Sequence, residues 1–139
     1  MPEFRPIVAG LAHQRYREGR GFEETAGYSR AARHGNRIAV SGTGDFEADG
    51  TIGHAGDTYG QTRSALARAV AAVEELGGLR EDVIRTRLYL APEADWREAV
   101  RAHKELLGGV DPANTTFFVA GFVDEAMLVE VELDADLGE

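Results

Sequence analysis

The last apolar segment of the chain carries acidic residues at alternate positions, and one of them is a candidate catalytic group. Glu130 stands between Val129 and Val131, so a strand that buries the two valines turns the carboxylate to its opposite face. On that face the carboxylate could act as a general base with a raised pKa. It could instead be the ion-pair partner of Arg85 or Arg87, and the residues alone favour this second interpretation.

Two short motifs imitate ligand-binding loops, but each lacks a part that the chemistry needs. Residues 45–50, DFEADG, place carboxylates at every second position before a glycine, as the start of a calcium loop does. The last position of such a loop is Gly56 here, which removes the bidentate glutamate. Residues 42–44, GTG, follow a predicted strand like a phosphate-binding turn, without the third glycine or the start of a helix. We expect an exposed hairpin at the first motif and no nucleotide at the second.

Several nucleophiles and metal ligands are excluded by residue type or spacing. The chain has no cysteine, which rules out disulfides, thiolate nucleophiles and cysteine-ligated zinc. Ser41 is not in a nucleophile elbow, because the glycine required two residues earlier is Ala39. We expect no metal site, because no two histidines have the i, i+4 spacing of a zinc-binding helix. The histidines are His13, His34, His54 and His103.

The composition is that of one acidic domain. The chain has 139 residues, of which 43% are hydrophobic, enough for a single core. Its formal net charge of −9 and its scattered basic residues would repel a phosphate backbone. No apolar run approaches the roughly 20 residues of a membrane span, and arginines interrupt the N-terminus where a secretory signal would be apolar. We expect one domain over residues 1–139, in the cytoplasm, without nucleic acid or membrane partners.

The elements that must position these residues begin with a hairpin. Residues 1–27 are expected to hold an N-terminal strand and an irregular, glycine-punctuated loop. Residues 36–42 alternate apolar and polar side chains as a strand does. Gly35-Asn36 predicts a tight turn that pairs this strand with residues 28–33.

Two amphipathic helices are predicted after the hairpin. From Thr58 the apolar residues recur every three or four positions until Gly77-Gly78, and Thr58 and Gln61 have the spacing of a capping box. A second helix is capped by Asp95, with Glu98 at the capping-box position. Its expected inner stripe consists of Trp96, Ala99, Val100, His103 and Leu107.

Three further strands predict an α+β fold. Residues 82–90 should place Ile84, Thr86, Leu88 and Leu90 on one face. Residues 115–120 and 127–133, joined by a turn around Asp124, are expected to form a second hairpin. Both helices are expected on one face of the sheet, so the open face must be solvated or buried by another chain. The side chains expected on this open face are Arg85, Arg87, Tyr89, Leu128, Glu130 and Glu132.

Five segments, in one order along the chain, resemble the YjgF/Rid family. They are residues 26–42 (AGYSRAARHGNRIAVSG), 61–66 (QTRSAL), 82–86 (DVIRT), 112–113 (PA) and 128–132 (LVEVE), so the resemblance covers about residues 26–136. It implies a chorismate-mutase-like fold with two helices on one face of a mixed sheet. It also implies a homotrimer with three small-molecule pockets between subunits, which hydrolyses reactive enamines and imines, such as 2-aminoacrylate, without a metal or organic cofactor.

The same resemblance implies roles for particular residues. Tyr28, Ser41 and the backbone around Gly42 would line the pocket, and Glu130 would order the attacking water. Asn114 stands where archetypal members have the arginine that grips the substrate carboxylate. Asparagine can hydrogen-bond but has no charge, so a simple amino-acid-derived imine should bind poorly.

Two more positions depart from the family pattern. Thr116 stands where many relatives have cysteine, and Arg101 where the archetype has an asparagine near the pocket. Arg87 or Arg101 could supply the missing cation, or each could belong to an interface ion pair. The leading hypothesis is a hydrolase or lyase of a small imine, enamine or related carbonyl adduct, in which Asn114 and Thr116 orient the ligand. The alternatives are a non-catalytic trimer that binds a metabolite or a partner enzyme, and an endoribonuclease, against which the net charge counts.

Overall fold

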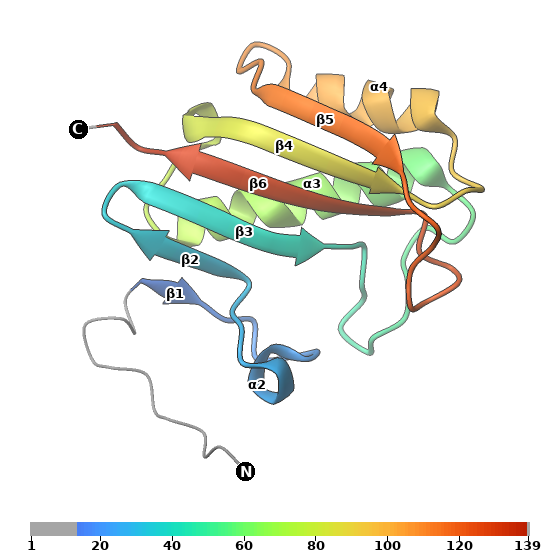
Figure 1. Ribbon diagram of the computed structural model, residues 1–139, viewed down its shortest axis with the longest axis horizontal. Helices are drawn as coiled ribbons and strands as arrows, with labels where there is room; N and C mark the ends of the chain where they lie inside the picture. Colours follow the sequence, from blue (N-terminus) through green and yellow to red (C-terminus); the bar gives the residue numbers. More distant parts are fainter. Residues whose placement is uncertain (1–13, 139) are drawn as a thin grey trace.

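Six strands in the described part of the chain form one mixed sheet. A computed structural model describes residues 14–138, and the strand order is β1-β2-β3-β6-β4-β5 (Figure 1). β4 and β5 are parallel, whereas all other neighbouring strands are antiparallel. The strands are β1 (Arg15–Tyr16), β2 (Ala31–His34), β3 (Arg37–Thr43), β4 (Val83–Leu90), β5 (Ala113–Phe118) and β6 (Val129–Asp136).

The N-terminal segment contains more regular structure than the sequence predicts. β1 pairs with β2 at the edge of the sheet, and the short helix α2 (Glu23–Ala26) follows it. His13 and the first part of the predicted N-terminal strand and loop lie outside the described residues. β2 and β3 form the predicted hairpin, in which Gly35 takes the left-handed φ of +60° that a two-residue turn requires.

The helix α3 (Thr58–Glu75) confirms the first apolar stripe but not its predicted cap. The cap is Asp57, whose carboxylate accepts a hydrogen bond from the Gly60 N–H at 2.9 Å. The Thr58 hydroxyl instead accepts from the Asp95 N–H at 3.0 Å, which ties the start of α3 to the start of the next helix. Gln61 is fully buried, donates to the Ala126 carbonyl at 3.0 Å and accepts from the Leu128 N–H at 2.8 Å.

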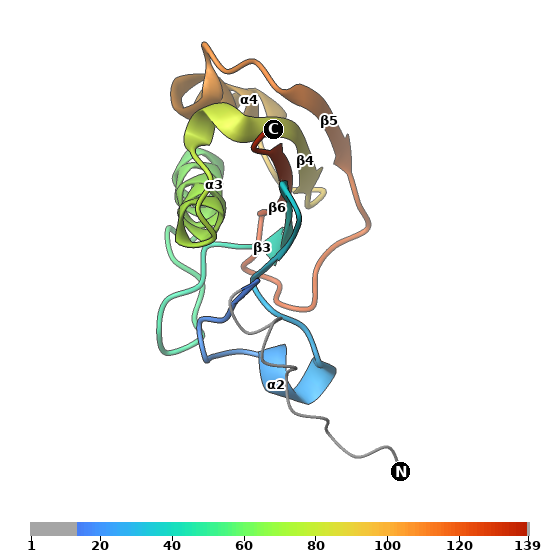
Figure 2. The same ribbon diagram turned by 90° about the vertical axis from the view of Figure 1, so that its left-hand side faces the viewer.

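The helix α4 (Trp96–Leu107) begins at the predicted cap, because the Asp95 carboxylate accepts hydrogen bonds from two N–H groups of the first turn. Its predicted inner stripe is partly wrong. Trp96 and Val100 are 47% and 44% exposed, whereas Ala99 and Ala102 are buried. α4 packs beside α3 on the same face of the sheet (Figure 2).

The predicted C-terminal hairpin is wrong. β5 lies parallel to β4 at the far edge of the sheet, and β6 is inserted between β3 and β4 (Figure 1). The unit β4-α4-β5 is a crossover that returns the chain in the same direction, and such a crossover produces parallel strands. Residues 119–128 are long enough to carry the chain from the edge back to the centre of the sheet.

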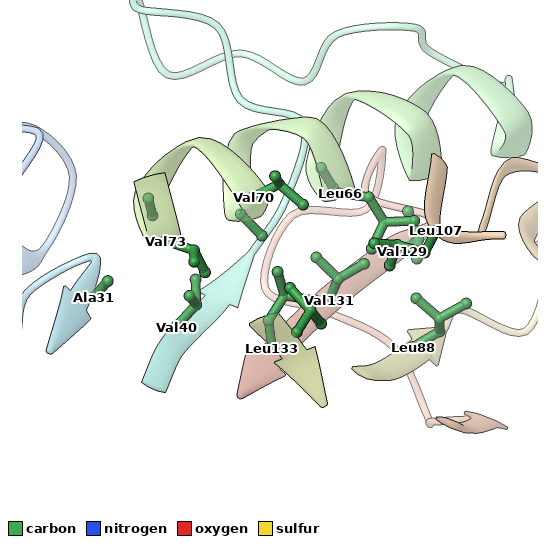
Figure 3. Close-up of a cluster of buried hydrophobic side chains, with 14 of the residues drawn as sticks. Ala31, Val40, Leu66, Val70, Val73, Leu88, Leu107, Val129, Val131 and Leu133 are labelled. Atoms are coloured by element: carbon green, nitrogen blue, oxygen red, sulfur yellow. The ribbon is translucent and has the colours of Figure 1, made fainter. Parts of the chain in front are cut away.

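Alternation along β6 separates the core from the open face. Val129, Val131 and Leu133 are buried under the helices, among the apolar side chains in Figure 3. The predicted faces of Leu128 and Ile84 are wrong, because regular pairing between β6 and β4 stops at these positions. Leu128 precedes β6 and is buried in the core, and Ile84 is exposed because the β4–β6 register shifts between Val83 and Arg85.

Candidate functional site

A β-bulge near the end of β3 creates room for Glu130. The register of β3 against β6 shifts between Val40 and Thr43, so Ser41 and Gly42 lie in an irregular segment of the strand. Gly42 faces the Glu130 side chain, and a methyl group on this glycine would lie 2.8 Å from the carboxyl carbon of Glu130. A residue with any side chain at position 42 would therefore displace the carboxylate.

Glu130 is half-buried and faces away from the helices. Burial raises the pKa of Glu130 above its usual value, the nearby charge of Glu132 raises it further, and Arg30 opposes both effects. The ion pair that the residues alone favour is not formed with Arg87, which pairs with Asp134 at 3.4 Å. No cation of residues 14–138 lies within ion-pair distance of Glu130, so the carboxylate fits the alternative role of a general base.

A cavity of about 630 Å³ lies where β3 ends. The N-terminal segment, β3 and its following loop, α3, and residues 121–130 contribute to its wall. We call it the β3-end cavity. Its charged or polar lining includes Arg20, Tyr28, Arg30, Arg68 and Glu130, and its apolar lining includes Phe22, Phe46, Phe122 and Met127.

Arg30 is buried beside the bulge, 5% exposed. One of its guanidinium nitrogens, Nη1, donates to the Gly42 carbonyl at 2.5 Å and to the Thr43 hydroxyl at 2.9 Å. Its other terminal nitrogen, Nη2, donates a longer hydrogen bond of 3.4 Å to the Tyr28 hydroxyl. Arg30 therefore joins Tyr28 to the strand that faces Glu130.

Three arginines surround a single carboxylate, that of Glu18. Arg68 donates hydrogen bonds to the Glu18 carboxylate from two nitrogens. Nitrogens of Arg30 and Arg20 lie 3.4 and 3.6 Å from its oxygens. Burial by itself would raise the pKa of Glu18, but the hydrogen bonds from Arg68 and the charges of all three arginines lower it below its usual value. The sequence alone does not indicate this cluster, because no spacing rule joins residues 18, 20, 30 and 68.

The structure brings Tyr28, Gly42 and Glu130 together at the β3-end cavity. Ser41 lies beside them in the bulge, where its hydroxyl donates to the Ser29 carbonyl at 2.7 Å. Ser41 thus holds the segment that carries Tyr28 against β3.

Asn114 and Thr116 belong to a different region, on β5. The Thr116 hydroxyl donates to Asn114 at 2.9 Å, and the Asn114 amide donates to the Thr86 hydroxyl at 3.0 Å. Thr86 in turn lies 2.8 Å from His103 Nε2. Thr86 is buried beneath α4, so Asn114 lies on the helix side of the sheet, opposite to Glu130. Within one subunit these two residues cannot contact the same small ligand.

Arg101 lies on the outer surface of α4. It pairs with Glu98 at 2.6 Å and Glu105 at 3.2 Å, and its guanidinium stacks 3.8 Å from the centre of the Tyr59 ring. Arg87 pairs with Asp134 on the open face. Neither arginine lines the β3-end cavity of its own subunit.

The remaining motifs form ordinary structure. Phe46 and Ile52 pair in a short bridge, so the segment that imitates a calcium loop is a hairpin. Asp45 lies 2.7 Å from His54 Nδ1, and this hydrogen bond raises the pKa of His54. Among residues 14–138, no group of three or more possible ligands could hold a metal ion, and no helix is long and apolar enough to cross a membrane.

The sequence model of the family described as Endoribonuclease L-PSP matches residues 20–137. The chain belongs to the YjgF/YER057c/UK114 family. It is 43% identical over 127 residues to the protein SCO2049 of Streptomyces coelicolor, an alignment that covers 91% of this chain and 94% of the relative.

Solved structures of the YjgF family have the same fold. The crystal structure of Rv2704 from Mycobacterium tuberculosis is 34% identical, with a TM-score of 0.77, over 88% of this chain and 97% of that one. The YjgF gene product of E. coli is 20% identical, with a TM-score of 0.70, over 89% and 94% of the two chains, and shows the fold alone. Proteins of the YjgF family are typically homotrimers, and membership supports a function related to small molecules.

Proposed function

We propose that this protein is a hydrolase of small reactive imines or enamines, or of related carbonyl adducts. Glu130 would position and activate the attacking water in a pocket between the subunits of a homotrimer. The observation that carries the proposal is the half-buried Glu130 carboxylate, held against Gly42 at the wall of a large cavity. A carboxylate with a raised pKa can accept a proton and return it during one reaction cycle.

Glu130 would act on water rather than on the substrate carbon. It takes one proton from the water as the water oxygen forms a bond to the imine carbon, and it passes this proton to the nitrogen, which gives a carbinolamine. It then takes the proton of the new hydroxyl group and passes it to the same nitrogen as the carbonyl bond forms and the carbon–nitrogen bond breaks, which releases ammonia and leaves the carbonyl product. Water and imine enter, ketone or aldehyde and ammonia leave, and Glu130 ends as it began.

The opposite placement of Asn114 and Glu130 supports a site built from two subunits. If both residues contact one ligand, as the family resemblance implies, they must come from different copies of the chain. β5 is an edge strand, and it exposes the large apolar side chains Phe117 and Phe118. An exposed apolar edge of this kind suits a contact between copies of the chain. A sedimentation mass near 15 kDa at micromolar concentration would show a monomer and contradict this assembly.

Asn114 restricts the substrates that this site should accept. The amide of Asn114 donates to Thr86 and has no charge, so it cannot form an ion pair with a substrate carboxylate. A small imino acid, 2-iminopropionate, has only a methyl group besides its carboxylate and imine. We therefore expect it to be a poor substrate compared with imines that have larger apolar groups.

An oxidase-coupled assay tests this proposal. An L-amino-acid oxidase generates the imines of leucine, phenylalanine or alanine, and ammonia release is followed with and without the purified protein. We expect acceleration for the leucine and phenylalanine imines, and a loss of about 100-fold to 10,000-fold in the Glu130→Gln variant. Asp136→Asn, on the same face of β6 but at its far end, is the matched control and should retain activity. Rates equal to buffer with every imine would reject the proposal.

The uncharged Asn114 also favours a second candidate, a trimer that binds a metabolite or partner enzyme without catalysis. In that case a ligand would bind at the β3-end cavity and Glu130→Gln would leave every measured rate at the level of buffer. Ribonuclease activity is named in the family's description, but the net charge of −9 opposes binding to RNA. We expect no RNA binding in a filter assay at 150 mM salt.

A further inference from the structure

The three arginines of the β3-end cavity are arranged in a row, which we call the arginine wall (Arg20, Arg30 and Arg68). Arg30, Arg68 and Arg20 donate to the carbonyls of Gly42, Gly44 and Phe46 at 2.5, 2.8 and 3.4 Å. These carbonyls belong to every second residue along the extension of β3, so they point to the same side of the chain. The row comes from three separate segments of the sequence and is assembled only by the fold.

The arginine wall carries more positive charge than its own partner neutralises. The three guanidinium groups share the carboxylate of Glu18. A guanidinium has five N–H donors, and Arg30 makes two hydrogen bonds through Nη1 and one through Nη2. The buried Nε of Arg30 forms no hydrogen bond within residues 14–138 and is only in ion-pair contact, at 3.4 Å, with Glu18 Oε1. A buried guanidinium whose donors are not all hydrogen-bonded, with two partly exposed arginines beside it at a cavity, is suited to bind an anion.

The rest of the cavity is suited to an apolar group. Phe46 and Met127 both lie against Gly44, where a methyl group would be 3.0 Å from the Phe46 ring and 2.6 Å from the methyl carbon of Met127. Phe22 and Phe122 also line the cavity. A ligand with an anionic group at the arginine wall could therefore place an apolar body against these aromatic and methionine side chains.

We propose that the β3-end cavity binds organic carboxylates that carry an apolar side chain, with the carboxylate held by the arginine wall. This inference rests on the proposed function, because it names the class of substrate for the same site. The cation that β5 lacks at Asn114 is supplied from the other side of the sheet, in the subunit that holds Glu130. The substrates are then imino acids with leucine-like or phenylalanine-like side chains.

Acidic groups at the same cavity define the rival ligand. Glu47, Asp124 and Glu130 also line it, and they would favour an organic cation over an anion. Burial and the charge of Glu132 raise the pKa of Glu130, and the charge of Arg30 opposes this rise, so the positive charge of the wall already acts on this carboxylate. The sign of the preferred ligand charge separates the two ligand classes.

Three molecules of equal size test the sign of that charge by calorimetry at pH 7.5. They are 3-phenylpropanoate, 3-phenylpropanamide and 3-phenylpropylamine, which carry the same ring on a negative, neutral or positive head group. We expect the acid to bind at least about tenfold more tightly than the amide, because charge-assisted hydrogen bonds are about twice as strong as neutral ones. Equal binding of acid and amide, tighter binding of the amine, or no binding of the acid would each overturn the proposal.

Single substitutions locate the acid at the arginine wall. Arg68→Gln should weaken binding of the acid about tenfold and leave the amide unchanged, and the more exposed Arg20→Gln should weaken it about threefold. Arg63→Gln is the matched control, because Arg63 lies on the same helix but points to solvent and should have no effect. Glu18→Gln removes the competing carboxylate, so the acid should bind more tightly. Equal acid affinity in Arg20→Gln, Arg68→Gln and Arg63→Gln contradicts the assignment.

Failure of this inference can be told apart from failure of the proposed function. Glu130→Gln should bind 3-phenylpropanoate at least as well as the unchanged protein, since it removes a negative charge from the cavity, while it abolishes turnover. Retained turnover in Glu130→Gln rejects the mechanism but not the anion site. Turnover that is lost in Glu130→Gln, together with equal binding of acid and amide, rejects the anion site but not the mechanism.

Discussion

The end of β3 and the edge strand β5 are polar regions of this sheet that differ in charge. At the end of β3, three arginines that share Glu18 line a cavity together with three acidic residues. On β5, the neutral side chains of Asn114, Thr116 and Thr86 form one chain of hydrogen bonds with His103. The positive charge that is absent at Asn114 on β5 is therefore present elsewhere in the same fold, at the end of β3. Whether the charged region binds ligand and the neutral one only stabilises β5 can be tested by substitution.

The largest expected difference between the two regions is in stability. Arg30→Met removes a buried guanidinium and leaves Glu18 and the Gly42 carbonyl short of a donor, so it should lower the free energy of unfolding by about 3 kcal/mol. Asn114→Ala removes neutral hydrogen bonds at an exposed edge and should cost about 1 kcal/mol. Urea unfolding of both variants measures the difference. Equal losses would show that charge does not distinguish the two regions.

A positive charge placed on β5 should make this strand more like the charged end of β3 and improve turnover of a small imino acid. If β5 and Glu130 meet across a subunit interface, Asn114→Arg adds a cation on β5 to those of the arginine wall. Turnover of 2-iminopropionate at low concentration should then rise about thirtyfold, which corresponds to about 2 kcal/mol. Thr115→Arg, on the opposite face of the same strand, is the control and should give no increase. An unchanged rate in Asn114→Arg would show that β5 does not reach the site.

Acid should weaken the two regions in different pH ranges. Burial lowers the pKa of His103, so its contribution to stability is present above its unfolded value of 6.5 and is lost as the pH falls below it. The pKa of Glu18 is also lowered, so Glu18 likewise contributes to stability at neutral pH. This contribution is lost only as the pH falls below 4.5. Thermal unfolding from pH 7.5 to 3.5 should show both losses. His103→Gln should remove the first and Glu18→Gln the second, and any other assignment of the two steps contradicts these shifts.

The sequence predicted most elements of the fold, because each one has a local signal. The Gly35-Asn36 turn, the apolar stripe of α3 and the Asp95 cap all act within a few residues, and the structure confirms them. The stripe predicted for α4 is confirmed only in part, since Trp96 and Val100 are exposed. The order of β5 and β6 has no such signal. Two strands that are neighbours in sequence usually pair, and only the packing of α4 against α3 and β4 places β5 at the edge.

The candidate site was predictable where alternation along a strand gives the face of a side chain. Glu130 alternates with buried valines, so its face could be read from the pattern, and the family resemblance singled it out. Ile84 and Leu128 show the limit of that pattern, because a register shift and the end of a strand each cancel strict alternation. Arg101 and Asn114 show a second limit, since a position in an alignment does not give the direction of a side chain.

The amino-acid sequence by itself determined the α+β fold, the family and the face of the sheet on which Glu130 lies. These properties follow from the periodicity of apolar residues and from short motifs, which act locally along the chain. Only the tertiary structure brought Glu18, Arg20, Arg30 and Arg68 together at the end of β3. Electrostatic interactions depend on distance in space and on burial, and neither is fixed by the separation of residues in the sequence.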